Sequence, residues 1–66
     1  MNIGLVIRSI RAQKGINIRT LSQKTGLNIS NLSLIEQGKR QPQIDTVVKI
    51  LDALGAELIV REKDGD

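Results

Sequence analysis

The sequence contains no cysteine, no histidine and no aromatic residue. Without cysteine the chain has neither disulfides nor thiolate metal ligands, and without histidine it lacks the commonest metal ligand and general base. No paired carboxylates form a readable motif and no glycine loop suits a phosphate, so an enzyme is not expected, nor is any metal or other cofactor. A chain of 66 residues forms one domain with a small core, and its stability must come from well-packed aliphatic helices, oligomerisation or both.

Acidic residues are scarce until the end of the chain. Residues 1–56 hold Glu36, Asp45 and Asp52 against eight lysines and arginines, whereas four of the seven acidic residues lie at or after position 57. Residues 1–56 are therefore basic, which favours a polyanionic partner. The sequence shows no signal peptide, membrane-spanning run or lipidation motif, and with the absence of cysteine this favours a cytoplasmic protein with no membrane partner.

The middle of the chain has the pattern of two short helices joined by a sharp turn. Asn17 is a favourable helix cap, and the apolar residues after it recur at helical spacing, which predicts a helix over 18–25. Gly26 suits the left-handed conformation that ends a helix. Asn28 is a second cap, and it predicts another helix over 29–37. Two short helices with a glycine in the turn between them form a helix-turn-helix.

Apolar spacing predicts two further helices over 3–13 and 43–54. Leu5 lies on the opposite side of the first helix from the core, where it is either an isolated surface leucine or part of a protein–protein contact. The residues expected in the core are Ile3, Ile7, Ile10, Ile18, Leu21, Thr25, Leu32, Ile35, Ile44, Val47, Val48, Leu51 and Leu54.

The β-branched and aliphatic content of residues 56–61 predicts a strand. A single strand would leave its backbone groups unpaired, so the same strand of a second subunit is expected to pair with it across a two-fold axis. The expected dimer interface consists of Leu58, Ile59 and Val60, with Leu58 and Val60 covering the fourth helix. The alternative is a fourth helix that runs on, or a loose tail. The charged residues 62–66 are expected to be disordered, after a domain over 1–55.

A longer pattern runs through the predicted helices and the turns between them. Its residues are Ile3-Gly4, Ile7-Arg8, Ile10-Arg11, Leu21-Ser22, Gly26, Leu32, Ile35-Glu36, Gly38, Pro42 and Leu54-Gly55. This pattern resembles that of the Cro/repressor (XRE) class of helix-turn-helix proteins. The resemblance implies an all-α, lambda-repressor-like bundle of four main helices, here with a short C-terminal β-strand pairing across a dimer. The alternative is a small helical bundle with no role at DNA.

In this class the second helix of the motif enters the major groove of DNA. The resemblance therefore implies base contacts from Asn28, Ile29, Ser30, Ser33 and Leu34. Asn28 is suited to adenine and Ser30 to either base type, whereas Ile29 and Leu34 either pack on thymine methyl groups or lie partly buried against their neighbours. This surface lacks arginine or lysine for guanine, so an A/T-leaning site is expected.

The resemblance also implies contacts to DNA phosphates from Arg11, Ile18, Arg19, Asn31, Gln37, Lys39 and Arg40. Many members carry a glutamine where this chain has Ile18, so only the backbone N–H groups there remain to bind a phosphate. Arg11 corresponds to a family arginine that pairs with Glu36, joining the first and third helices. Lys39 and Arg40 form a basic loop that in the family lies along the sugar–phosphate backbone.

The resemblance implies a sequence-specific transcriptional repressor that binds double-stranded DNA as a homodimer on an inverted repeat. The tail resembles that of the Hip-type antitoxins, whose C-terminal strands pair in the dimer and whose toxin is a serine/threonine kinase. This implies an autoregulatory antitoxin with a kinase-like toxin as protein partner. The alternative is a phage Cro/repressor-like regulator, or a restriction–modification controller, without a toxin partner.

Overall fold

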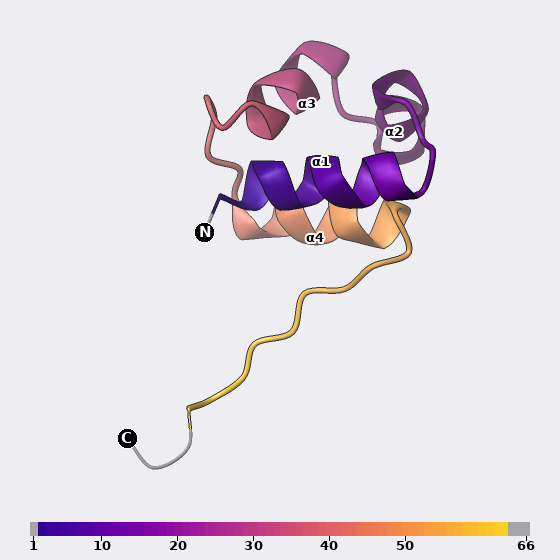
Figure 1. Ribbon diagram of the computed structural model, residues 1–66. Coiled ribbons are helices and arrows are strands. Elements are labelled where there is room, and N and C mark those ends of the chain that lie inside the picture. Colours follow the sequence, from indigo (N-terminus) through magenta and orange to yellow (C-terminus); the bar gives the residue numbers. More distant parts are fainter. Residues whose placement is uncertain (1, 64–66) are drawn as a thin grey trace.

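The computed structural model describes residues 2–63, as four helices followed by an extended segment (Figure 1). The helices are α1 (Ile3–Gln13), α2 (Ile18–Thr25), α3 (Ile29–Glu36) and α4 (Ile44–Ala53). The four predicted helices are confirmed, and only the end of α3 and both ends of α4 differ from the predicted ranges, each by one residue. None of the helices described is long and apolar enough to cross a membrane.

Asparagine begins each of the first three helices. The side-chain oxygens of Asn2, Asn17 and Asn28 accept hydrogen bonds of 2.7–3.0 Å from backbone N–H groups in the first turn. Each cap satisfies a donor that has no partner within its own helix. Gly26 ends α2 in the left-handed conformation, with φ of 75°, and turns the chain toward α3. The predicted turn of the helix-turn-helix is therefore present.

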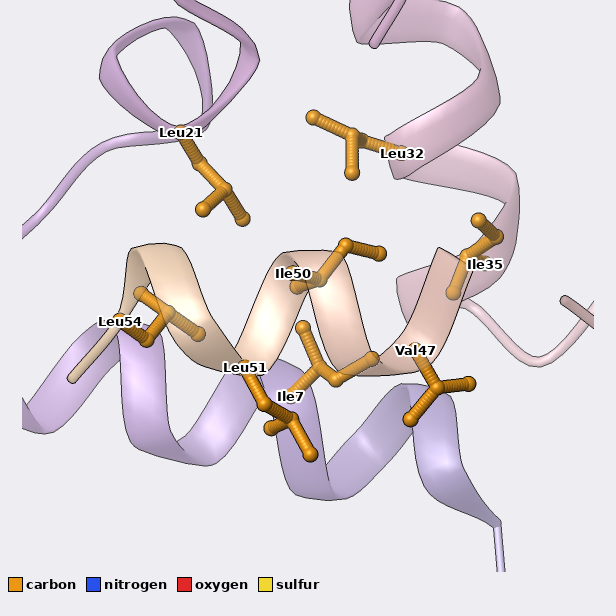
Figure 2. Packing of buried hydrophobic residues seen from close by; sticks show 8 residues of the cluster. All are labelled: Ile7, Leu21, Leu32, Ile35, Val47, Ile50, Leu51 and Leu54. Carbon is orange, nitrogen blue, oxygen red and sulfur yellow. The ribbon is translucent and has the colours of Figure 1, made fainter. Parts of the chain in front are cut away.

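One aliphatic core joins the four helices, since α3 and α4 each pack against both α1 and α2. Figure 2 shows the side chains of all four helices converging on this core. The buried apolar residues are Ile7, Leu21, Leu32, Ile35, Val47, Ile50, Leu51 and Leu54.

The buried face of α4 differs from the predicted one. Ile50 is fully buried although it was not among the expected core residues, whereas Ile44 and Val48 are 61% and 49% exposed. The prediction was wrong for Ile44 and Val48 because helical spacing defines a wide stripe but not which edge of it contacts the neighbouring helices. With α4 packed on both α1 and α2, the stripe is turned toward Ile50, and Ile44 and Val48 are left on the surface.

The backbone of α1 closely approaches that of α3 at Gly4. A Cβ atom on Gly4 would lie 1.8 Å from the carbonyl oxygen of Ile35 and 2.8 Å from its carbonyl carbon. Real side chains do not tolerate such distances, so the two helices can meet here only because position 4 is glycine. This contact sets the position of the third helix relative to the first.

Residues 56–63 extend from the end of α4 without regular secondary structure (Figure 1). A strand that pairs with a second subunit cannot appear in one chain, so the predicted strand over 56–61 stays a prediction. The side chains of Leu58, Ile59 and Val60 are 41%, 68% and 90% exposed in the single chain. The predicted disordered tail includes residues 64–66, which lie outside the described residues.

Candidate nucleic-acid interface

The third helix has two contrasting sides. Leu32, Ile35 and Glu36 are buried, which fixes α3 against the rest of the protein. The predicted base-facing residues lie away from this buried side: Asn28 and Ser30 are exposed, and Ile29, Ser33 and Leu34 are half-buried. This surface carries no charge, so its contacts to a base edge would come from hydroxyl, amide and apolar groups.

The structure limits what Asn28 can do at a base. Its Oδ1 atom accepts a hydrogen bond of 2.7 Å from the backbone N–H of Ser30, which caps α3. A bidentate contact to adenine needs both the oxygen and the nitrogen of an asparagine amide. Such a contact would compete with the cap, whereas the Nδ2 group remains a donor. Ser30 is therefore the less constrained polar residue of this surface.

Two hydrogen bonds connect predicted phosphate-contacting residues to α3. Gln37 Nε2 donates to Ser33 Oγ at 2.8 Å, and Arg40 Nη1 donates to Asn31 Oδ1 at 2.6 Å. The basic loop is folded back on the helix, because the backbone N–H of Arg40 also donates to the carbonyl of Leu34 at 3.3 Å. Asn31 thus holds the Arg40 guanidinium beside α3.

The predicted ion pair between the first and third helices is confirmed. Arg11 Nε and Nη2 donate to the two carboxylate oxygens of Glu36 at 2.7 and 2.8 Å, and Nη1 donates to the carbonyl of Ile16 at 2.9 Å. Bidentate geometry of this kind is the strongest form of an arginine–carboxylate pair. The hydrogen bonds that Arg11 donates to Glu36 raise the pKa of Arg11 above its usual value, although partial burial opposes this. Glu36 therefore offsets the positive charge of Arg11.

An open hollow lies where α1, α2 and α3 meet. It has a volume of about 360 Å³. Its lining residues are Arg8, Arg11, Ile18, Ser33, Glu36 and Gln37. The structure thus brings together three of the predicted phosphate-contacting residues, namely Arg11, Ile18 and Gln37. The other four, Arg19, Asn31, Lys39 and Arg40, do not line this hollow.

Reasoning from the sequence missed Arg8 as a residue of this hollow. Arg8 and Arg11 are three residues apart on α1, so their side chains lie on neighbouring positions of one helix face. That spacing was the available signal, but the sequence alone did not show which elements this face meets.

Removing either cation of the basic loop tests its predicted phosphate contact. We expect Lys39→Ala and Arg40→Ala each to weaken binding to all DNA sequences by a similar factor, and to lower the slope of log affinity against log salt by about 0.9. Fluorescence-anisotropy titrations at several salt concentrations measure both quantities. Lys49→Ala, which removes an exposed cation from α4, is the matched control. A loss confined to one operator would contradict the phosphate role.

The chain is similar to known helix-turn-helix proteins. A family model described as helix-turn-helix matches residues 7–59. Two structures of the clp gene regulator ClgR from Corynebacterium glutamicum are similar to this one, with TM-scores of 0.83 and 0.82 and 30% sequence identity each. The matches cover 86% and 85% of this chain, and 73% and 60% of the ClgR chains. No curated protein matches the chain significantly. The chain belongs to the XRE-type helix-turn-helix family of DNA-binding transcription regulators.

Proposed function

We propose that the chain is a transcriptional repressor that binds as a homodimer to an inverted repeat, in its own promoter. The surface around α3 is the observation that supports DNA binding. We call the uncharged surface formed by Asn28, Ile29, Ser30, Ser33 and Leu34 the reading face. The hollow lined by Arg8 and Arg11 lies at one edge of this face. Arg40, which is hydrogen-bonded to Asn31, lies beside the helix. Phosphate contacts of this kind fix the register of a protein on DNA, while groups on the helix read the base edges.

Apolar exposure on α4 and the tail supports the homodimer. Ile44, Val48, Leu58, Ile59 and Val60 are between 41% and 90% exposed. Ile44 and Leu58 line one hollow between the start of α4 and the tail. Apolar exposure of this extent is typical of an interaction surface. In the proposed dimer the same surface of a second copy covers these side chains, and the 56–61 strands pair across the axis. Two copies of α3 then enter successive major grooves, about 34–36 Å apart.

Removing residues 57–66 tests the dimer. We expect the truncated chain to sediment as a monomer, or to be much less stable, because the apolar surface of the tail is lost. Val48→Lys should also favour the monomer without unfolding it, since this side chain is already half exposed in the single chain. Gln23→Lys, at an exposed position of α2, is the control for the added charge. A dimer that persists in both variants would contradict the proposed interface.

We extend the proposal to the antitoxin half of a toxin–antitoxin pair, with a Hip-like kinase as the toxin. Leu5 is 53% exposed on α1, and with Ile59 it supplies apolar surface for a protein partner besides DNA. The alternative is a phage Cro/repressor-like or restriction–modification controller regulator without a toxin. Similarity to a clp gene regulator supports transcriptional control and favours neither role. A neighbouring kinase-like gene would support the antitoxin role, whereas an integrase or restriction gene would support the alternative.

The first experiment is a fluorescence-anisotropy titration with the DNA upstream of the gene for this chain and with a scrambled duplex, at two salt concentrations. We expect tight, salt-sensitive binding that prefers the native duplex. Ser30→Ala should change this preference more than it changes affinity for the scrambled duplex, because its hydroxyl lies on the reading face. Weak binding that does not distinguish the two duplexes would contradict autoregulation by the chain alone.

A further inference from the structure

The two arginines of the hollow differ in their electrostatic state. Arg11 is tied to Glu36 by two hydrogen bonds, and the two charges of this pair cancel. Arg8 is exposed, and among residues 2–63 it has no hydrogen bond or ion pair with another side chain. Arg8 therefore supplies the net positive charge of the hollow.

The remaining walls combine one apolar residue with two neutral polar ones. Ile18, at the start of α2, offers no side-chain donor. Ser33 Oγ accepts from Gln37, which leaves the serine hydroxyl hydrogen free to donate. A hollow of about 360 Å³ has room for a phosphate group together with several waters.

We propose that Arg8 binds a phosphate of the DNA backbone at this hollow and replaces the contact that Ile18 cannot make. The inference rests on the DNA binding described above. It assigns to α1 a charged contact beside the reading face, next to an Arg11 whose charge is already balanced. An arginine one turn from Arg11 reaches the same hollow from the same helix, so no change of fold is required.

Salt-dependent DNA binding of Arg8→Ala tests the assignment. One phosphate contact contributes about 0.9 to the slope of log affinity against log salt. We expect the slope of the variant to fall by that amount, and the ratio of wild-type to variant affinity to shrink about 3.5-fold between about 50 and about 200 mM salt. The loss should be equal on operator and scrambled duplexes. Lys49→Ala is the control, and circular dichroism checks that each variant is folded.

A second substitution tests the relation between Arg8 and Ile18. In the Arg8→Ala background, Ile18→Gln should restore part of the affinity, because the amide donates to a phosphate oxygen. It should leave the reduced salt slope unchanged, because glutamine is neutral. A rescue that is absent, or that also restores the slope, would overturn the proposed replacement.

The outcomes separate this inference from the proposed function. If the wild-type chain binds neither duplex, the proposed function fails. If the wild type binds, but Arg8→Ala has the wild-type slope or matches Lys49→Ala, the assignment of Arg8 is overturned and the proposed function stands.

Discussion

Replacing Gly4 with alanine is expected to lower the free energy of unfolding by about 1–3 kcal/mol, the usual cost of forcing extra atoms into a packed interior. Alanine is the better helix former by about 1 kcal/mol, so helix propensity alone predicts the opposite sign. Steric contact decides the outcome, because the new methyl group would lie 1.8 Å from the carbonyl oxygen of Ile35. That atom belongs to the backbone of α3 and cannot rotate away as a side chain can.

Urea unfolding followed by circular dichroism measures the effect. Ser9→Ala is the matched control, because it adds helix propensity at an exposed position of the same helix without a new contact. We expect the midpoint of Gly4→Ala to fall and that of Ser9→Ala to rise slightly. DNA affinity of Gly4→Ala should also fall, since α1 must move relative to α3. A midpoint for Gly4→Ala at or above that of the wild type would show that the two helices separate at little cost.

Replacing Arg11 with methionine is expected to be the most destabilising change at the ion pair. It leaves the carboxylate of Glu36, whose side chain is 5% exposed, without its partner. Breaking a buried pair in this way costs about 3–5 kcal/mol. A domain of this size has roughly 3–10 kcal/mol of total stability, so the variant should be partly or wholly unfolded.

The two halves of the pair should differ in cost. Glu36→Gln leaves Arg11, which is 18% exposed and keeps its hydrogen bond to the carbonyl of Ile16, so we expect a smaller loss than for Arg11→Met. The double variant Arg11→Met/Glu36→Leu should recover much of the lost stability, because apolar replacement of a whole buried pair is often neutral. Thermal and urea unfolding of the three variants give the comparison. Arg8→Met on the same helix is the control, and a loss for Arg11→Met no larger than for this control would contradict the structural role of the pair.

Features of the fold that depend on residues close together in the sequence, such as helix caps and turns, could be predicted. Asn17 and Asn28 cap their helices as expected, and Gly26 makes the turn between them. The pairing of Arg11 with Glu36 came from the resemblance to the XRE class, since nothing local connects residues so far apart in the chain. The predicted base-facing residues do lie together on the accessible side of α3, but their contacts with DNA stay predictions.

The features that were missed depend on how the helices pack. Ile50 belongs to the core because α4 packs against both α1 and α2. The spacing of apolar residues along the sequence does not show how a helix is rotated toward its neighbours. Gly4 was recognised only as part of the family pattern, and its role in the fold became visible only in the structure, where its lack of a side chain admits the backbone of α3. The hollow beside Arg8 is formed by residues of three helices, so it could be recognised only once the relative positions of these helices were known.

Because α3 has separate buried and accessible sides, a protein of this fold could gain new DNA target sites without losing its structure. Leu32 and Ile35 anchor the helix in the core, while Ser30 lies outside it. With the base contact proposed for Ser30, exchanging this residue should change base preference without disturbing the residues that hold the helix. A library of variants at this position should therefore yield folded proteins with different DNA targets. Gene duplication followed by one or two such exchanges would separate two regulators that share a single scaffold.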